Sequence, residues 1–353
     1  MPVIDADTHI DEPEEAWQFM EGPAARFRPV TISPPEGVVP GGMDASASRW
    51  WLVDGRLRQR MIRNDELTGT TLNSRELLDV NERLRHMDER GVDVHVIYPT
   101  FFLSYITGNP QAEIALTDSW SRYVAAKCAP TEGRLRWVAV PPLLDIDASV
   151  SYLRWAKENG AVGVFKRGLE HGRRVSDPYF FPLYEEASAL DMALCIHTGA
   201  GNPTEARLGH GDGLGGVPIM DAFHALMLYG VPDKFPKLRF GFIEAGSTWL
   251  PYVLDRLKAE KKRRSWIRSF EMGEDLLRRN RFFIAVDAVE DISYILSLGA
   301  EDSLMMGSDY SHFDTSAEPD AIDAVRRWAA EGRISDVAAR KILEDNPKAF
   351  YGI

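Results

Sequence analysis

An aspartate and a histidine two residues apart end the first apolar run of the chain, residues 3–9 (Val-Ile-Asp-Ala-Asp-Thr-His). Side chains alternate along a β-strand, so Asp7 and His9 point to the same side of such a strand. Carboxylate and imidazole groups are ordinary ligands of divalent metals, and folding alone gives no reason to place both on an inner strand face. The pair therefore predicts one edge of a metal site.

Further ligand types end later apolar runs. His197 precedes a glycine-rich turn, and Asp309 ends the run 303–309. Charged groups are costly to bury alone, so their repetition at strand ends indicates one shared site. We interpret His197 as a metal ligand rather than a satisfied core histidine. Asp309 is interpreted as a ligand that also accepts a proton from metal-bound water, rather than as a helix cap. The strand-end set is Asp7, His9, Lys166, His197, Glu244, Asp287 and Asp309.

Strand-like and helix-like segments alternate along the chain. Helical patterns such as 112–129, 148–159 and 181–190 separate the apolar runs, and a helix is expected from Ser74, as its N-cap, to about Gly91. This alternation predicts an α/β fold, a (β/α)8 TIM barrel. An open doubly wound sheet is the alternative, but polar residues at so many strand ends favour the barrel. The predicted strands are 2–5, 91–100, 135–141, 161–166, 193–197, 238–244, 281–287 and 303–309.

The segment from about 19 to 73 interrupts the alternation. It is rich in proline and glycine, and Asp54-Gly55 predicts a hairpin turn after the Trp-Trp-Leu-Val run at 50–53. We interpret the segment as an insertion after the first strand that covers the barrel mouth; a surface loop packed for stability is the alternative. Residues 1–353 are otherwise expected to form a single barrel domain.

Composition restricts the partners. The formal net charge is −12 and the pI about 5.2, which argues against nucleic acids and anionic membranes. Two cysteines and no long apolar stretch favour a cytoplasmic protein. We expect a small-molecule substrate, and assembly as a homo-oligomer or with a homologous barrel subunit.

Several motifs together resemble those of the amidohydrolase superfamily. The chain is identified as a member of its amidohydrolase-related (amidohydrolase 2) branch, which includes aminocarboxymuconate-semialdehyde decarboxylase-like enzymes, and the resemblance covers nearly the whole chain. The motifs are residues 5–13 (Asp-Ala-Asp-Thr-His-Ile-Asp-Glu-Pro), 196–199 (Ile-His-Thr-Gly), 235–240 (Phe-Pro-Lys-Leu-Arg-Phe), 307–312 (Gly-Ser-Asp-Tyr-Ser-His) and the tail 345–352 (Asp-Asn-Pro-Lys-Ala-Phe-Tyr-Gly).

The resemblance implies a divalent metal held by four residues: Asp7, His9, His197 and Asp309. Asp7 stands where many relatives have the first histidine of a His-x-His pair, although acidic residues also occur there in the branch. Oxygen and imidazole ligands suit zinc, manganese or iron.

The sixth strand departs from the better-known pattern of the branch. Many relatives have a histidine where this chain has Glu244. A glutamate there can act as a general base or hold a second metal ion; a buried ion pair with an arginine is the alternative. His312, three residues after Asp309, is a further ligand candidate for a second ion, and a surface loop histidine is its alternative.

Two residues are candidates for substrate contact. Lys166 ends the fourth strand, where some superfamily members carry a carbamylated lysine between two metals; a salt bridge or a grip on a substrate carboxylate is favoured instead. His210 lies in the glycine-rich stretch 199–216, which would suit a mobile lid.

Three hypotheses follow for the function. The first is a single-metal enzyme that hydrolyses a C–N or C–O bond, or non-oxidatively decarboxylates a small organic acid or aromatic amide, with Asp309 and Glu244 as catalytic residues. The second is a dinuclear non-haem Fe or Fe/Mn oxygenase that uses Asp7, His9, His197, Glu244, Asp309 and His312 as ligands. The third is an inactive barrel subunit that serves a partner.

Overall fold

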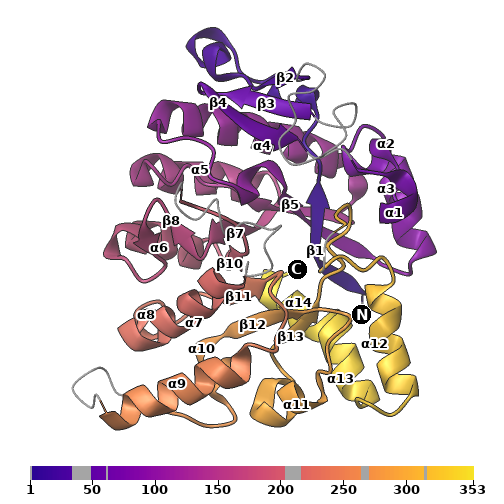
Figure 1. Ribbon diagram of the computed structural model, residues 1–353, viewed down its shortest axis with the longest axis vertical. Coiled ribbons are helices and arrows are strands. Elements are labelled where there is room, and N and C mark those ends of the chain that lie inside the picture. The colour runs from indigo at the N-terminus through magenta and orange to yellow at the C-terminus, as the bar shows by residue number, and fades with distance from the viewer. Residues whose placement is uncertain (1, 34–48, 61–62, 203–215, 264–269, 314–315) are drawn as a thin grey trace.

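Eight parallel strands follow one another around a nearly closed barrel, in the order in which they occur in the chain (Figure 1). The structure is a computed structural model that describes residues 2–33, 49–60, 63–202, 216–263, 270–313 and 316–353. All eight predicted strands form. They are β1 (Ile4–Ile10), β5 (Val94–Pro99), β6 (Leu135–Ala139), β7 (Ala161–Arg167), β10 (Ala193–His197), β11 (Phe240–Ile243), β12 (Phe282–Val286) and β13 (Leu304–Met306).

The first and last strands meet through the residues that end them. The backbone N–H of Asp309 donates to the carbonyl of Asp7 at 3.0 Å, and the N–H of His9 donates to the carbonyl of Tyr310 at 2.8 Å. Sequential strand order with this closure confirms the TIM barrel and excludes a doubly wound sheet, in which the strand order reverses.

Helices alternate with the barrel strands and lie outside them (Figure 1). Local caps begin several of them. The Asn109 side chain accepts from the N–H of Gln111 at the start of α4 (Pro110–Cys128), and Asp145 accepts from the N–H of Ala148 at the start of α5 (Ile146–Glu158). The main helices are α3 (Val80–Glu89), α4 (Pro110–Cys128), α5 (Ile146–Glu158), α6 (Phe181–Ala189), α7 (Val217–Tyr229), α9 (Leu250–Arg263), α10 (Leu276–Asn280), α12 (Ala321–Ala330) and α13 (Asp336–Arg340).

The remaining helical segments of the described chain are short. They are η1 (Glu14–Trp17), η2 (Gly22–Phe27), α1 (Asp65–Thr68), α2 (Leu72–Arg75), η4 (Phe101–Leu103), η5 (Ala129–Thr131), η6 (Pro178–Phe180), α8 (Val231–Lys234), α11 (Ser293–Ile295), η7 (Leu296–Ala300), η8 (Lys341–Asp345) and α14 (Asn346–Tyr351). Within the described chain, no helix combines the length and the apolar character that crossing a bilayer requires.

The helix predicted from Ser74 is divided in the structure. Leu77 adopts φ +53°, in the left-handed region that a helix cannot contain, and this separates α2 from α3. Thr71 caps α2 and Asp79 caps α3, so the predicted N-cap role of Ser74 is wrong. Ser74 instead forms a capping box with Thr71.

The predicted hairpin forms within the segment between β1 and α3. Strands β2 (Val30–Ile32), β3 (Arg49–Val53) and β4 (Arg56–Arg60) make an antiparallel sheet, shown at the top of Figure 1. Asp54 and Gly55 both have positive φ, as a type I′ turn requires. Trp51 packs on Phe101, with ring centroids 6.3 Å apart, so the sheet lies beside the C-terminal end of β5. That residues 19–73 cover the mouth of one 1–353 domain stays a prediction.

Candidate metal centre

Six of the predicted site residues meet at the C-terminal ends of the barrel strands. The structure contains two overlapping groups of metal-capable atoms, and the atoms of each group lie within 4.8 Å of one another. Strands β1, β10 and β11 supply or immediately precede the first group, and the segment after β13 completes the second. The first group is Asp7, His9, His197 and Glu244; the second is His9, Asp309 and His312.

Carboxylate oxygens surround the two imidazoles of the first group. His9 Nε2 lies 3.3 Å from Asp7 Oδ1 and 3.4 Å from Asp309 Oδ1. His197 Nε2 lies 3.2 Å from Glu244 Oε2 and 3.5 Å from Asp7 Oδ1. All of these side chains are buried, so they face one another in the protein interior rather than in bulk water.

Backbone carbonyls set the tautomer of both histidines. His9 Nδ1 is 3.1 Å from the carbonyl of Pro99, and His197 Nδ1 is 3.1 Å from the carbonyl of Thr198. A carbonyl oxygen only accepts, so each Nδ1 carries the proton. Each Nε2 therefore directs a lone pair at the carboxylates, as a metal-binding histidine does when its other nitrogen is held by a carbonyl.

The donor set fits a divalent cation. Asp7 Oδ1, His9 Nε2 and His197 Nε2 are buried and have no hydrogen-bond partner within the described residues. Acceptors that face one another without a donor cost free energy in a protein interior. A cation would satisfy all three atoms, and carboxylate with imidazole ligands suits zinc, manganese or iron.

The protonation states agree with that fit. Burial lowers the pKa of His9 to about 4, and the charge of Arg63 acts in the same direction. Burial opposes the charge of Asp7, yet the neighbouring His197 and His9 hold its pKa below the ordinary value. A neutral imidazole and an ionised carboxylate are the forms that bind metals.

Strained backbone supports the cluster. Glu244 has φ +56° and Asp309 has φ +52°, in the left-handed region that residues with a side chain rarely adopt. Such strain is typical of functional sites, where the surrounding structure imposes it. Gly307 permits a close approach, because a Cβ on it would lie 2.5 Å from the Cβ of Asp7.

Two polar residues near the cluster were missed by the sequence analysis. Thr100 Oγ1 lies 2.8 Å from His312 Nε2, on the far side of the ring from Asp309, whose Oδ1 is 2.7 Å from Nδ1. Ser316 donates to Glu244 Oε1 at 3.3 Å and to Asp309 Oδ2 at 3.4 Å. Thr100 follows the end of β5 and could have been found by its strand-end position; no local pattern marks Ser316.

A buried glutamate, also unforeseen, holds the loop after Glu244. Glu290 accepts from the backbone N–H groups of Ser247 at 2.7 Å, Thr248 at 2.9 Å and Asp287 at 3.1 Å. Asp287, a strand-end residue, lies outside both metal-capable groups, and its N–H serves this loop anchor. Hydrogen bonds from several N–H groups to one carboxylate are strong, so Glu290 holds the turn that follows Glu244 in place.

Lys166 is not brought to the cluster. Along β7 and β10, Lys166 pairs with Ile196, and Arg167 pairs with His197, so Arg167 shares the inner face. The Lys166 Nζ instead lies 3.7 Å from the ring centroid of Phe180, between strand and helices. Arg167 is occupied by Glu170, with contacts of 3.0 and 2.6 Å. The other predicted substrate residue, His210, lies outside the described residues.

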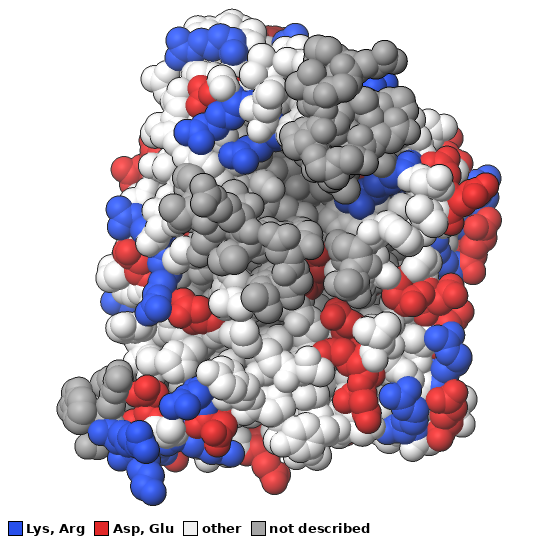
Figure 2. Space-filling model, in the orientation of Figure 1, with Lys and Arg blue, Asp and Glu red and all other residues white. Residues whose placement is uncertain are grey.

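Charge on the surface is uneven. Figure 2 shows lysine and arginine side chains gathered over β3 and β4, where Arg56, Arg58 and Arg60 alternate along β4.

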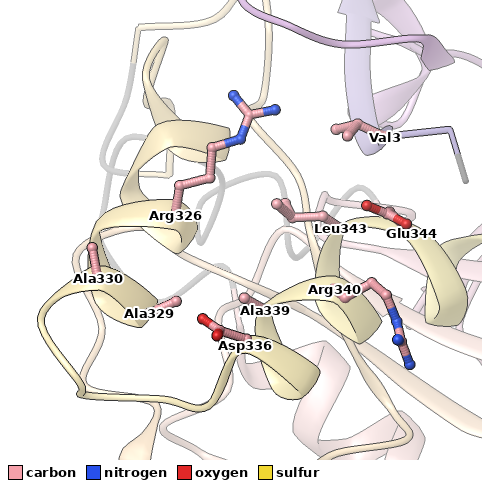
Figure 3. A pocket seen from close by; sticks show the side chains of 9 residues that line it. All are labelled: Val3, Arg326, Ala329, Ala330, Asp336, Ala339, Arg340, Leu343 and Glu344. Atoms are coloured by element: carbon pink, nitrogen blue, oxygen red, sulfur yellow. The ribbon is translucent and has the colours of Figure 1, made fainter.

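A separate hollow of about 360 Å³ lies between α12 and the α13–η8 segment, beside Val3 at the start of β1 (Figure 3). It is at the opposite end of β1 from Asp7 and His9, and none of the cluster residues lines it.

Comparison with known proteins gives consistent matches. The family model described as Amidohydrolase matches residues 4–353. A gamma-resorcylate decarboxylase from Polaromonas sp. is 28% identical over 306 residues, 78% of this chain and 88% of that protein. An amidohydrolase structure from Mycobacterium avium subsp. paratuberculosis K-10 has a TM-score of 0.78 and 18% identity, covering 100% of this chain and 98% of that one. A 5-carboxyvanillate decarboxylase from Novosphingobium aromaticivorans, solved with bound manganese, has a TM-score of 0.65 and 20% identity, covering 80% and 83%.

Proposed function

This chain belongs to the amidohydrolase family, and we propose that it is a metal-dependent carbon–carbon lyase that removes CO2, without oxidation, from an aromatic or similar small organic acid. The observation that carries the proposal is the convergence of Asp7 Oδ1, His9 Nε2 and His197 Nε2, three buried acceptor atoms with no hydrogen-bond partner within the described residues. Between hydrolysis and decarboxylation, the curated relatives favour decarboxylation, because one is the gamma-resorcylate decarboxylase and another, from Dictyostelium discoideum, is a 2-amino-3-carboxymuconate-6-semialdehyde decarboxylase.

Asp7, His9 and His197 would hold one divalent ion together with Asp309, whose Oδ1 lies 3.4 Å from His9 Nε2. Manganese is the ion we favour because it is bound in the 5-carboxyvanillate decarboxylase. The ion would act as a Lewis acid on substrate oxygens. The histidine Nδ1 bonds to Pro99 and Thr198 keep the two rings in the ligand orientation.

Proton delivery falls to Asp309. When an aromatic acid loses CO2, the ring carbon gains a proton, the C–C bond breaks, and its electron pair stays on the carbon. Asp309 Oδ2 accepts from Ser316 at 3.4 Å, and its Oδ1 lies 2.7 Å from His312 Nδ1, so polar groups surround the carboxylate that remains when Asp309 gives up a proton. The Thr100 hydroxyl lies 2.8 Å from His312 Nε2 and holds this ring beside Asp309.

Glu244 is the second catalytic residue of the proposal. Its Oε2 lies 3.2 Å from His197, and its Oε1 accepts from Ser316, so it borders the same space as Asp309. A carboxylate at this place can accept a substrate proton or orient a water molecule, whereas a protonated histidine cannot accept a proton.

Carbon dioxide release tests the proposal. The manganese-loaded protein is incubated in D2O with a panel of hydroxybenzoates, including 2,6-dihydroxybenzoate and 5-carboxyvanillate. We expect CO2 from at least one acid, with a single deuterium at the carbon that carried the carboxylate. Amides, esters and lactones form a second panel; hydrolysis of one of them, with no CO2 from any acid, would instead establish the hydrolase alternative and contradict the lyase.

A second candidate function is favoured by the second metal-capable group. His312 Nδ1 and Asp309 Oδ1 lie 2.7 Å apart beside His9, an arrangement in which His312 could be a ligand rather than a donor. Two redox metals there would make a dinuclear Fe or Fe/Mn oxygenase. Metal analysis of protein from its native source separates the candidates: one ion per chain supports the lyase, and two iron or manganese ions support the oxygenase.

We also propose an active subunit, a cytoplasmic location and an oligomeric assembly for this chain. The inactive-subunit alternative predicts lost ligands, whereas the six candidate residues are all present. Two buried free cysteines suit a reducing cytoplasm. Assembly as a homo-oligomer, or with a homologous barrel subunit, is tested by light scattering of the purified protein and by mass spectrometry of complexes isolated from cells.

A further inference from the structure

The strand that carries Asp7 and His9 contains a bulge. Asp5 pairs with His95 and Thr8 pairs with Ile97, so two residues of β1, Ala6 and Asp7, oppose the single residue Val96 of β5. A bulge inserts one extra residue and re-aims the side chains around it. Here it makes a change of face possible within β1.

The change of face can be read from the partner strand. His95 and Tyr98 are three residues apart on β5, so they point to opposite faces. Their partners Asp5 and His9 therefore also face opposite ways, although four residues separate them. The bulge thus directs Asp7 and His9 into the barrel and Asp5 out of it.

The backbone carbonyls of the bulge have partners outside the β1–β5 ladder. The Asp7 carbonyl accepts from the N–H of Asp309 at 3.0 Å. The Ala6 carbonyl accepts from the hydroxyl of Tyr351 at 2.6 Å. Tyr351 is the last residue of α14, so the C-terminal tail of the chain reaches the bulge beneath the first metal-ligand candidate.

The hydrogen-bond chain continues to the floor of the metal site. The Ala6 carbonyl can only accept, so Tyr351 donates to it, and the Tyr351 oxygen accepts from the hydroxyl of Tyr98 at 2.6 Å. The Tyr98 ring lies 5.0 Å from the His197 ring and is in register with His9. Both tyrosines are fully buried.

Packing fixes the tail in this position. The ring of Phe350 fills the space above Gly241, where a Cβ would lie 2.3 Å from a ring carbon. Arg239 donates from Nε to the Phe350 carbonyl at 2.7 Å. Tyr351 therefore reaches Ala6 from a rigid support.

We propose that Tyr351 is a positioning residue of the metal site: its hydroxyl holds the β1 bulge that aims Asp7 and orients Tyr98 beneath His197. The proposal rests on the metal site of the proposed function, but not on decarboxylation. Removing a group that hydrogen-bonds a metal ligand typically weakens metal affinity by roughly 10–100-fold. Tyr351 bonds the backbone carbonyl one residue before Asp7.

The test compares two tyrosine-to-phenylalanine variants. Tyr351→Phe removes the bulge contact and keeps the ring. Tyr184→Phe is the matched control, because Tyr184 is also fully buried and donates to a carbonyl, that of Val175, at 2.6 Å, but on α6. The dissociation constant for Mn²⁺ is measured by the EPR signal of the free ion. We expect roughly tenfold or greater weakening in Tyr351→Phe and little change in Tyr184→Phe.

Two further measurements exclude a general loss of stability. In the metal-free protein, hydrogen exchange of the β1 peptide should accelerate in Tyr351→Phe and stay unchanged in Tyr184→Phe. Tyr98→Phe, which leaves the Ala6 bond intact, should weaken Mn²⁺ binding less than Tyr351→Phe. Equal Mn²⁺ constants in Tyr351→Phe and Tyr184→Phe would overturn the inference, as would a wild-type protein that binds no Mn²⁺. Tight Mn²⁺ binding without CO2 release would refute only the proposed function, and the comparison of constants would still decide this inference.

Discussion

The two sides of β1 both bury polar groups, but they treat them differently. On the outer side, Asp5 accepts from the N–H of Ser308 at 2.9 Å and from its hydroxyl at 2.5 Å. Arg83 there donates to His95 and to the carbonyl of His9. On the inner side, Asp7 Oδ1, His9 Nε2 and His197 Nε2 converge, and none of them has a hydrogen-bond partner within the described residues. A buried acidic or imidazole group does not itself indicate function; a converging set that lacks donors does.

The inner side should be the sensitive one for metal binding. Removing the His197 imidazole leaves Asp7 and Glu244 facing each other without a ligand between them. We expect His197→Ala to lose its metal on dialysis and to lose all activity. His224→Ala, a half-buried histidine on α7, is the control and should retain both. Full metal content in purified His197→Ala, measured by plasma mass spectrometry, would remove His197 from the ligand set.

The charge of Glu244 is expected to matter for turnover more than for the first ion. Glu244→Gln keeps the size and the bond to Ser316 while removing the negative charge. For the lyase, we expect activity to fall by about 10²–10⁴-fold with one ion per chain retained. Loss of one of two ions in the same metal analysis would favour the dinuclear oxygenase, and unchanged turnover would exclude a catalytic role.

Crowding Asp7 should weaken the site without removing a ligand. In Gly307→Ala, the new methyl group would lie 2.5 Å from the Cβ of Asp7 and must displace it. We expect roughly tenfold weaker Mn²⁺ binding by EPR titration. Gly216→Ala is the matched control, because its methyl group meets Ala245 at an ordinary 3.7 Å. If both variants bound Mn²⁺ like the wild type, the close approach of β13 to Asp7 would have no role in the site.

The outer face of β7 should affect stability alone. Burial lowers the pKa of Lys166 from 10.5 to about 7, so between these values the unfolded chain binds more protons and the stability of the wild type rises with pH. Lys166→Met lacks this dependence. The gain in unfolding free energy from the substitution, measured in urea, should therefore be larger at pH 7 than at pH 9.5, by on the order of 2–3 kcal/mol. Mn²⁺ affinity should not change.

An opposite result would place Lys166 elsewhere. A gain that is equal at both pH values would mean that the buried amine does not titrate in this range. A loss of Mn²⁺ affinity or of turnover in Lys166→Met would support the expected substrate contact rather than the packing on Phe180.

The sequence was sufficient for features that depend on strand ends. Eight apolar runs between helices predicted the barrel, and parallel strands of a barrel bring their C-terminal ends together, so Asp7, His197 and Asp309 could be grouped without long-range information. Lys166 also ends a predicted strand, but a period of two makes the next residue, Arg167, face the barrel instead.

Other features depend on contacts between distant segments. Ser316 and Tyr351 reach the site through loops and a tail whose local pattern contains no mark of that role. The division of the helix at Leu77 has no local mark either, since leucine rarely adopts the left-handed backbone that it has here. Contacts of this kind can be identified only from the three-dimensional structure.

We infer that the inner side of β1 is one edge of a divalent-metal site. Anomalous scattering from crystals of the Mn²⁺-loaded protein tests it most directly. We predict a peak about 2.2 Å from Asp7 Oδ1, His9 Nε2 and His197 Nε2. A map with no peak among these atoms, or with manganese bound only elsewhere on the protein, would contradict the claim.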